Sequence, residues 1–245
     1  MNVNILGFDV DRITWNELLE KIDGFVKSRK PHKIILLNPY LLLEAKKHPD
    51  YAQYIRECDI VTADGIGLLI AGRLYGKPFP ERVTGTDLMP KLAELGAKKG
   101  WKFYFLGSMP GVAEKAHQNL KKKYPGFRVV GVHDGYFSEN EEKKIVNDIK
   151  GKKPDILMVC MGALKQERFI KKYQDKINIP LAFGIGALFD FYACKFKRAP
   201  KWMQNSGLEW LFRLIQEPRR LWKRYLIGNF VFMFAVFKEY LKIKI

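Results

Sequence analysis

The sequence predicts an α/β fold: a three-layer, Rossmann-like core with a mostly parallel sheet, followed by a C-terminal helical appendage. Short, continuously apolar runs alternate with helical patterns over most of the chain, as expected for parallel strands covered by helices on both faces. The 245 residues suffice for one large domain with an appendage. From Lys195 onward, 12 Lys and Arg stand against 3 Asp and Glu, so this last fifth carries +9 of the net charge of +17. We therefore predict an α/β core at residues 1–194 and an appendage at residues 195–245.

The N-terminal region gives no sign of export or of a metal site. The stretch MNVNILGFDVDR lacks the cationic and continuously apolar regions of a signal peptide, so we expect a cytosolic protein. Asp9-Val10-Asp11 has the D-x-D pattern of a metal clamp, but it sits in a short hairpin-like segment rather than after a buried strand in mid-domain. The three cysteines and four histidines are scattered, without metal-ligand spacing. We predict no bound metal and no cofactor.

The first elements of the core follow in order. Thr14 to Glu17 form a capping box for a helix that reaches about Lys27. Residues 33–38, KIILLN, are a continuous apolar strand ending at Asn38-Pro39, and a leucine-rich helix comes next. This change from strand to helix at Asn-Pro predicts the first strand–helix unit of the sheet.

Asp64 is the first candidate for chemistry. It follows a short apolar strand over residues 60–62 and directly precedes Gly65 and an apolar helical pattern. Ligands of open α/β sheets bind outside the carboxyl ends of the strands, so a carboxylate there points at the ligand and can act as a general base. The alternative is a helix N-cap, a position that favours Asp. The pattern alone leaves both roles open.

A basic loop and four more strand–helix units complete the core. The loop over residues 77–86 ends in RVTGT, and a helix begins at Thr86 or Asp87 and runs toward Lys99. The remaining strands are predicted at residues 102–106, 127–132, 155–161 and 181–185. Such regular alternation predicts a sheet with helices on both faces.

Glycine-rich turns in the core suit an anionic ligand. The turn from Gly107 to Gly111 feeds a helix N-terminus, whose free N–H groups can hold a phosphate. A capping box at Ser138 opens another helix. Two nucleotide-binding motifs do not fit: no P-loop sequence occurs, and Gly184-Ile185-Gly186 lacks its third glycine because Phe189 stands there. We therefore expect neither a P-loop NTPase nor an NAD-binding protein.

The appendage contains a basic amphipathic helix followed by an apolar run. Pro218 fits the first turn of this helix. Its two predicted faces carry Leu221, Trp222, Tyr225 and Leu226 against Arg219, Arg220, Lys223 and Arg224. Residues 225–237 are almost wholly apolar but too few to cross a bilayer, which takes about 20, and Lys238, Lys242 and Lys244 follow. The pattern is typical of a membrane-associating helix on an anionic surface; a helix packed on the core with a solvated basic face is the alternative.

Several motifs together point to one family. They are DGIG at 64–67, RVTGTD at 82–87, LG at 106–107 with PGVAEKA at 110–116, Gly162 with KQE at 165–167, and FDFYACKFKRAPKWMQNSGLEWLFRLIQEPRRLWKRYLIGN at 189–229. These motifs resemble the WecG/TagA/CpsF family of glycosyltransferases. The resemblance spans nearly the whole chain and is most specific from Gly184 to Asn229.

The resemblance implies an inverting, metal-independent glycosyltransferase. Members of the family transfer N-acetylmannosamine from UDP-ManNAc to the 4-hydroxyl of GlcNAc-diphosphate-polyprenol, such as the undecaprenyl lipid, as in wall teichoic acid linkage-unit synthesis for the cell wall. The implied partners are the UDP-sugar, this lipid acceptor and an anionic membrane surface. The implied location is cytoplasmic, peripherally associated with the inner face of the cell membrane. Another UDP-sugar, such as ManNAc uronic acid or glucose, stays open within the same family.

The resemblance also implies roles for individual residues. Asp64 matches the catalytic base. Donor- and nucleotide-binding residues are implied at Asn38, Arg82, Gly107, Tyr136, Gln166 and Asp190. Arginines of the appendage are implied to close over the diphosphate, a role that we assign to Arg213, Arg220 and Arg224.

Three positions depart from the family pattern. Leu36 stands where the family often has Thr, two positions before Asn38, which removes a hydroxyl from the implied pocket and leaves the donor sugar open. Leu164 replaces a Pro before the Lys-Gln-Glu sequence. Cys194 replaces a usual glycine.

The chemistry of these residue types agrees with a transferase. A sugar hydroxyl needs a carboxylate within hydrogen-bond reach to take its proton, and a departing diphosphate needs cations or N–H donors.

Two other classes remain as alternatives: a basic nucleic-acid-binding protein and a non-enzymatic membrane scaffold. The first would place basic residues along a groove with exposed aromatics, so we predict no nucleic-acid partner. A non-enzymatic membrane scaffold would not require the glycine turns at the strand ends. Because an apolar tail can also be buried between subunits, a monomer and a homo-oligomer both fit.

Overall fold

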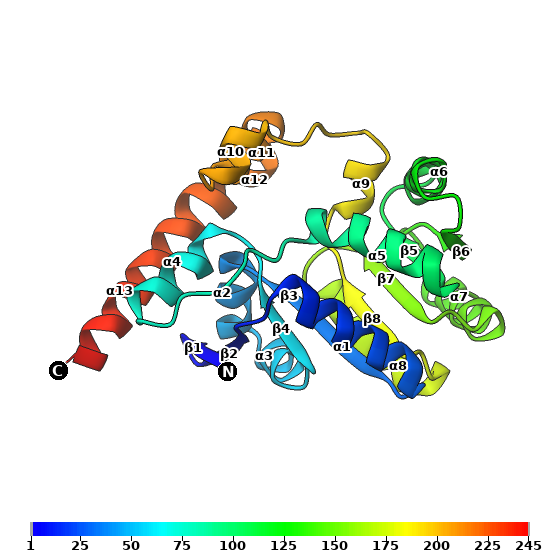
Figure 1. Ribbon diagram of the computed structural model, residues 1–245, viewed down its shortest axis with the longest axis horizontal. Helices are drawn as coiled ribbons and strands as arrows, with labels where there is room; N and C mark the ends of the chain where they lie inside the picture. The colour runs from blue at the N-terminus through cyan, green and yellow to red at the C-terminus, as the bar shows by residue number, and fades with distance from the viewer. Residues whose placement is uncertain (1, 245) are drawn as a thin grey trace. The chain divides into compact units, whose positions relative to one another are not determined.

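The computed structural model describes residues 2–244, with side chains through residue 242 (Figure 1). It contains two compact units, which we describe separately. Unit 1 comprises Met1–Thr14, Leu36–Thr84 and Phe196–Ile245, and unit 2 comprises Trp15–Ile35 and Gly85–Lys195. The segment predicted as the appendage therefore clusters with two earlier parts of the chain. The division into a core at 1–194 and an appendage at 195–245 stays a prediction.

A parallel sheet runs through the described residues and confirms the predicted α/β fold class. Its six strands follow the order β4-β3-β8-β7-β5-β6, and the pairs β3–β8, β8–β7, β7–β5 and β5–β6 are parallel. Buried strands in such a sheet need apolar side chains on both faces, which explains the continuous apolar runs in the sequence. The predicted strands are confirmed, with ends that differ by one or two residues.

Unit 2 consists of strands alternating with helices. Its elements are α1 (Trp15–Ser28), most of β3 (His32–Leu37), α5 (Gly85–Lys99), β5 (Lys102–Gly107), α6 (Val112–Lys123), β6 (Arg128–His133), α7 (Glu139–Lys152), β7 (Ile156–Cys160), α8 (Lys165–Ile177), β8 (Leu181–Gly184) and α9 (Leu188–Tyr192). The capping box at Ser138 is confirmed at the start of α7, where Glu141 completes it. Aromatic rings fill the core, with Phe105 stacked on Phe189 at a centroid distance of 4.4 Å.

The strand order reverses at β5. From β5 the chain moves to the edge strand β6, then returns past β5 to β7 and continues to β8. Because such crossovers are right-handed, α6 and α7 cover opposite faces of the sheet. The loops that follow β5 and β7 therefore lead to opposite faces of the sheet. Ligands of open α/β sheets bind at such a position, outside the carboxyl ends of the two strands.

Unit 1 holds the N-terminal hairpin, the segment around Asp64 and the C-terminal helices. Its elements are β1 (Asn2–Ile5), β2 (Phe8–Asp11), α2 (Pro39–Lys47), α3 (Pro49–Arg56), β4 (Ile60–Ala63), α4 (Ile66–Leu74), α10 (Lys201–Asn205), α11 (Glu209–Gln216), α12 (Pro218–Trp222), the π-helix η1 (Lys223–Ile227) and α13 (Gly228–Lys244). Strands β1 and β2 pair antiparallel, as predicted for the hairpin. Pro218 occupies the first turn of α12, which confirms that prediction as well.

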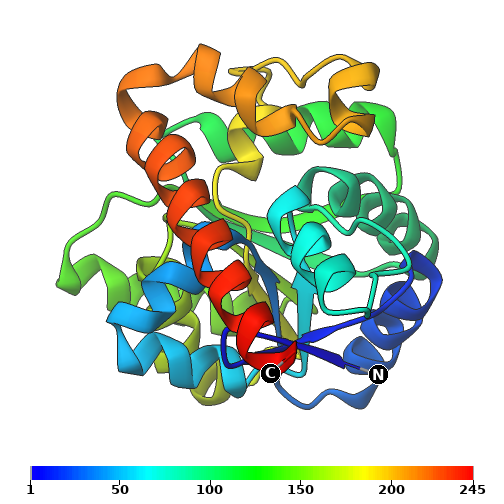
Figure 2. The same ribbon diagram turned by 90° about the vertical axis from the view of Figure 1, so that its left-hand side faces the viewer.

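Helix α13 packs against α2 and α4 within unit 1 (Figures 1 and 2). Phe232 and Val236 are fully buried there, and a Cβ added to Gly67 would lie 3.3 Å from the Phe232 ring. Near its end, the Glu239 carboxylate accepts hydrogen bonds from the Leu6 N–H and the Tyr75 hydroxyl. The C-terminal helix is thus held within unit 1 by apolar burial and by a partly buried polar cluster.

The other face of η1 and α13 exposes apolar side chains. They are Leu226, Ile227, Phe230, Val231, Phe234, Phe237 and Leu241. Among residues 2–244 no helix has both the length and the apolar character needed to cross a membrane. Lys238 and Lys242 are exposed, whereas the side chain of Lys244 lies outside the described residues.

The side chains on each of the two faces predicted for the 218–226 helix differ in their exposure. Leu221 is buried, but Trp222 and Leu226 are 44% and 52% exposed. Arg224, predicted on the basic face, is partly buried with its guanidinium 4.5 Å from the Tyr40 ring centre. The π-helical turn Lys223–Ile227 follows Trp222 and includes Arg224, and it inserts an extra residue into the helix.

Candidate functional site

Asp64 lies between strand β4 and helix α4, outside both. Its N–H donates to the Leu37 carbonyl at 2.7 Å, and its side chain is partly buried. The N-cap of α4 is Gly65, with a φ of 100°, and the helix has no side-chain cap. The N-cap alternative for Asp64 is therefore wrong. Glycine tolerates this positive φ, which lets the chain turn into α4 immediately after the carboxylate.

Asn38 and Arg82 belong to the same unit as Asp64. The Asn38 side chain caps α2, with Oδ1 accepting from the Leu41 N–H at 3.1 Å. Its Nδ2 hydrogens are the donors that it can offer to a ligand. Arg82 donates through Nη1 to the Gln204 carbonyl at 3.0 Å and lies 3.4 Å from Glu209. Arg82 thereby connects the basic loop to α10 and α11.

The three predicted arginines of the C-terminal helices also lie in unit 1. Arg213 is buried, forms an ion pair with Glu217 at 2.6 Å and stacks 3.6 Å from the centre of the Phe196 ring. Arg220 reaches the same carboxylate at 2.8 Å. One acidic side chain therefore serves two arginines, and with Arg224 the cluster carries an excess of positive charge that suits an anion.

Tyr225 connects this arginine cluster electrostatically to Asp64. Burial raises the pKa of the Tyr225 phenol, and the negative charge of Asp64 raises it further, whereas the positive charges of Arg224, Arg213 and Arg220 lower that pKa. The charges of the base candidate and of the three arginines therefore all act on this one phenol. No sequence pattern marked Tyr225 as a site residue, because it lay within the predicted apolar face.

The glycine turn after β5 joins the loops of unit 2. Gly107 has a φ of 119°, and a Cβ there would lie 2.3 Å from the Cys160 carbonyl oxygen. The next residue, Ser108, donates its N–H to that carbonyl at 2.7 Å and accepts from the Gly135 N–H at 2.9 Å. The loops that follow β5, β6 and β7 thus meet where the strand order reverses.

Gln166 is buried at the start of α8. Its Nε2 donates to Glu167 at 2.7 Å, and its Oε1 accepts from the Gly186 N–H at 3.3 Å. A Cβ at Gly184 would lie 2.3 Å from Nε2, so glycine is needed for this contact. Burial raises the pKa of Glu167 to about 7. Gln166 therefore connects the loops after β7 and β8.

The two other predicted nucleotide residues of unit 2 differ in their surroundings. Asp190 is buried in the first turn of α9 and forms an ion pair with Lys195 at 3.1 Å. Tyr136 is 70% exposed, and its N–H donates to Asp134 at 2.8 Å. An exposed ring offers a stacking surface, whereas the Asp190 carboxylate is held in place by its cation.

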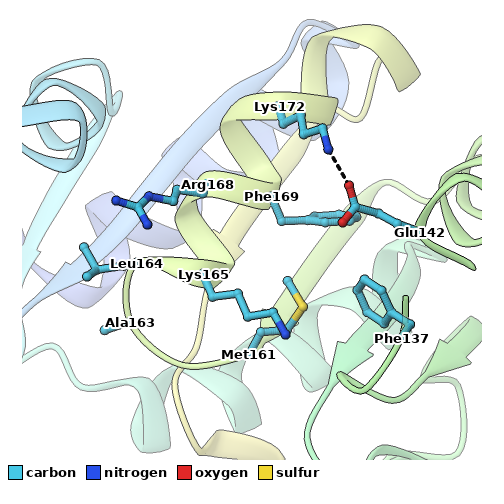
Figure 3. Close-up of a pocket in the computed structure, with 9 residues that line it drawn as sticks. All are labelled: Phe137, Glu142, Met161, Ala163, Leu164, Lys165, Arg168, Phe169 and Lys172. Atoms are coloured by element: carbon cyan, nitrogen blue, oxygen red, sulfur yellow. Dashed lines mark hydrogen bonds and ion pairs between the residues drawn. The ribbon is translucent and has the colours of Figure 1, made fainter. Parts of the chain in front are cut away.

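A cavity of about 430 Å³ in unit 2 was not predicted (Figure 3). Its apolar lining includes Phe137, Met161 and Phe169, and it also has basic side chains. Lys165 extends toward Phe137, with Nζ 5.7 Å from the ring centre, while Lys172 is paired with Glu142 at 2.6 Å. An aromatic wall with lysines suits a planar anionic ligand. The only sequence signal was the Lys-Gln-Glu motif, because the wall combines segments after different strands.

A second cavity of about 430 Å³ lies in unit 1. It is lined by α4, by the basic loop over residues 79–82 and by residues 204–207 of the α10 region. Arg82 is the only predicted site residue in its lining. The first residue of α4, Ile66, belongs to this lining and follows Asp64 by two positions.

The D-x-D carboxylates have structural partners. Asp11 accepts from the Val61 N–H at 2.8 Å, and Asp9 accepts from the Asn4 amide at 2.9 Å. They therefore join β2 to β4 and close the hairpin. In the described part of the chain, no group of three or more His, Cys, Asp or Glu side chains is arranged to hold a metal ion.

The three departures from the family pattern have distinct structural settings. Leu36 is buried in β3, where its side chain packs in the core. Leu164 has a φ of 68°, an angle that the ring of proline forbids. Cys194 has a φ of 59°, in the region that favours glycine. Both of these residues thus occupy backbone conformations with a positive φ, and Leu164 also lines the unit 2 cavity.

The comparisons with known proteins agree with this chemistry. The sequence model of the glycosyl transferase WecG/TagA/CpsF family matches residues 3–245. The N-acetylglucosaminyldiphosphoundecaprenol N-acetyl-beta-D-mannosaminyltransferase of Bacillus spizizenii is 32% identical over 202 residues, which cover 82% of this chain and 77% of that enzyme. The enzyme of the same name from Staphylococcus aureus is 29% identical over 244 residues, 99% of this chain and 94% of that enzyme. The resemblance is thus confirmed, and the chain belongs to the WecG/TagA/CpsF family of glycosyltransferases.

Proposed function

We propose that this protein transfers N-acetylmannosamine from UDP-ManNAc to the 4-hydroxyl of GlcNAc-diphosphate-polyprenol, with inversion at the anomeric carbon. Two relatives that cover most of the chain carry the name of this activity. The geometric observation that carries the proposal is the chain of contacts between Asp64 and the arginine cluster: the Asp64 N–H donates to the Leu37 carbonyl, and Arg224 lies 4.5 Å from the ring centre of Tyr40, three residues after Leu37. A base and an anion-binding cluster are the two groups that such a transfer needs.

Asp64 acts as the general base in this proposal. Its carboxylate takes the proton of the acceptor hydroxyl while that oxygen forms a bond to the anomeric carbon of the donor. The bond between this carbon and the diphosphate oxygen breaks, and UDP leaves with the electron pair. The arginine cluster stabilises the charge that develops on the diphosphate, since it already carries more positive than negative charge.

The nucleotide is held by unit 2 in this proposal. The Gly107 turn offers N–H groups at the reversal of the strand order, where α/β sheets bind ligands. Tyr136, Gln166 and Asp190 are the other proposed nucleotide contacts of unit 2, and Asn38 and Arg82 are the proposed donor contacts of unit 1. The lysines and aromatic rings of the unit 2 cavity support this assignment, because bases stack on rings and phosphates attract cations.

The proposed location is the cytoplasmic face of the cell membrane, without a spanning segment. The exposed apolar side chains of η1 and α13 support it. Seven such side chains lie on neighbouring turns, and an exposed apolar patch of this kind is typical of a surface that contacts a membrane or another protein. Lysines at the end of α13 and the net charge of +17 favour an anionic lipid surface. This location would bring the enzyme to its lipid acceptor.

The deciding experiment measures product from a panel of UDP-sugars with a short-chain GlcNAc-diphosphate lipid, with and without a chelator. We expect UDP-ManNAc to be the best donor and the chelator to have no effect. The panel includes UDP-glucose and the uronic acid form of UDP-ManNAc, because Leu36 leaves the donor sugar open. Preference for another UDP-sugar would change the assigned donor. A lack of transfer from every UDP-sugar in the panel would refute the proposal.

A further inference from the structure

The cavity of unit 1 has one wall formed by a single stripe of helix α4. Ile66, Leu69 and Arg73 line it and recur at the spacing that places side chains on one helix face. The facing wall contains Arg82 and Gln204. Gly207 closes the wall beside Ile66, since a Cβ there would lie 2.8 Å from the Ile66 side chain. The cavity therefore extends along α4 from its first residue to its last turn.

One end of the cavity is lined by the first residue of α4, close in sequence to the proposed base. Ile66 follows Asp64 by two residues, with only Gly65 between them. The helix rises about 1.5 Å per residue, so Arg73 lies about 10 Å farther along the axis than Ile66. A hexose ring with the phosphate attached to it extends over a comparable length.

The chemistry of the base decides which substrate this cavity takes. In a transfer to a hydroxyl, the general base contacts the acceptor oxygen, whereas the leaving group departs from the opposite side of the anomeric carbon. The 4-hydroxyl of the acceptor must therefore lie at Asp64, and the rest of the acceptor must extend away from it. The cavity along α4 offers that space within the same unit.

The far end of the cavity carries a cation suited to a diphosphate. Arg73 is exposed, and no hydrogen bond or ion pair of this side chain occurs within residues 2–244. Arg82, in contrast, is held by Gln204 and Glu209. Although Glu81 also lines the cavity, the lining keeps a net positive charge. A guanidinium binds two phosphate oxygens at once, so Arg73 can hold the group that follows the sugar.

The apolar surface of unit 1 accommodates the remaining part of such an acceptor. Helix α4 contacts α13, whose exposed side chains include Phe230 and Phe234. We infer that the α4 cavity holds the GlcNAc-diphosphate head of the lipid acceptor, with the sugar between Asp64 and Arg73 and the diphosphate at Arg73. This inference rests on the proposed function and adds the acceptor site to it.

The test uses the full-length protein and two acceptors, a short-chain prenyl GlcNAc-diphosphate and the corresponding GlcNAc-monophosphate. We expect Arg73→Gln to raise KM for the diphosphate acceptor at least tenfold, without a change in KM for UDP-ManNAc. The preference of the wild type for the diphosphate over the monophosphate should shrink in this variant. Arg73→Lys should recover part of the loss because it keeps the charge. Arg56→Gln, an exposed arginine at the end of α3, is the matched control and should behave as wild type.

The inference and the proposed function fail in different ways. If the wild type makes no product from the diphosphate acceptor, the proposed function is refuted, and direct binding of the same acceptor to the wild type and Arg73→Gln then tests the cavity. If the wild type is active, an unchanged acceptor KM in Arg73→Gln refutes the acceptor site. A rise in donor KM instead would place the donor in this cavity, which also refutes it. In the binding assay, equal affinities of the wild type and Arg73→Gln for the acceptor would also refute the acceptor site. So would a lack of binding by both proteins.

Discussion

At the scale of single residues, Asp64 stands out because the local structure gives it no capping role. Gly65 is the N-cap of α4, so the carboxylate is not needed to start the helix. We expect Asp64→Asn to lower kcat by about 10²-fold or more, the scale for loss of a general base, while UDP binding is retained. Steady-state kinetics and UDP protection against thermal unfolding measure the two effects. Asp59→Asn, at the other end of β4, is the control, and near-normal turnover by Asp64→Asn would exclude the base.

Glu167 makes stability depend on pH. Its pKa rises from 4.5 to about 7 because the carboxyl is buried, so the folded protein holds this proton more tightly than the unfolded chain. The group therefore disfavours folding increasingly as pH rises from about 4.5 to 7, and fully above that range. We expect Glu167→Gln to raise the free energy of unfolding at pH 8 by on the order of 1–3 kcal/mol and to leave it unchanged near pH 4.

Denaturant titrations at the two pH values measure this difference. The amide oxygen of Gln can still accept from the Gln166 side chain, so the variant keeps the local contact. Glu20→Gln, at an exposed position of α1, is the control and should give the same small change at both pH values. A gain for Glu167→Gln that is equal at pH 4 and pH 8 would rule out the titration of this carboxyl as its cause.

Cys194 occupies a backbone conformation that glycine adopts without strain. Its φ of 59° costs an L-residue on the order of 1 kcal/mol, and the family usually has glycine here. We expect Cys194→Gly to raise the free energy of unfolding by up to about 1 kcal/mol. The greater conformational freedom of glycine in the unfolded chain reduces this gain. Chemical denaturation measures it. Cys194→Ala removes the thiol but keeps the strain, so an equal gain in that variant would contradict this explanation.

At the scale of elements, the apolar face of α13 and the turn before it should determine membrane binding. Phe230 and Phe234 are 74% and 64% exposed, and burying a phenylalanine is worth about 1.5–3 kcal/mol. We expect the double change Phe230→Ser and Phe234→Ser to weaken binding to anionic lipid vesicles at least tenfold, without loss of stability. Vesicle flotation measures binding. Met109→Ser, at an exposed apolar residue of unit 2, should leave it unchanged, and equal binding by both variants would contradict the proposed location.

Individual elements were predictable where their signals are local. The capping box at Ser138 and the proline of α12 fix helix starts through contacts within one turn, so a single sequence reveals them. The π-helical turn Lys223–Ile227 was not predictable, because its residues carry no local signal that distinguishes it from an α-helical turn. Arg224 belongs to this turn, and its contact with the Tyr40 ring joins it to a segment far away in the sequence.

At the scale of the whole molecule, the parts of the site that need tertiary contacts could not be predicted. The α4 cavity joins Ile66, Arg82 and Gln204, which are far apart in the sequence. The pairing of Arg213 with Glu217 is local, but its stacking on Phe196 depends on how the C-terminal helices fold back. Charge and apolar patterns predicted which residue types matter, whereas their partners are set by packing across the chain.

The separation of predicted site residues between the two units leads to the last prediction. The base candidate and the arginine cluster belong to unit 1, whereas the Gly107 turn and Asp190 belong to unit 2. Deletion of residues 196–245 removes the arginines and uncovers the surface of α2 and α4 that α13 buries. We therefore expect loss of transfer and a lower Tm, whereas UDP should still raise the Tm of the truncated protein, because most of the proposed nucleotide contacts remain. Thermal unfolding with and without UDP distinguishes these effects, and a truncated protein with full transferase activity would refute the role of the arginines.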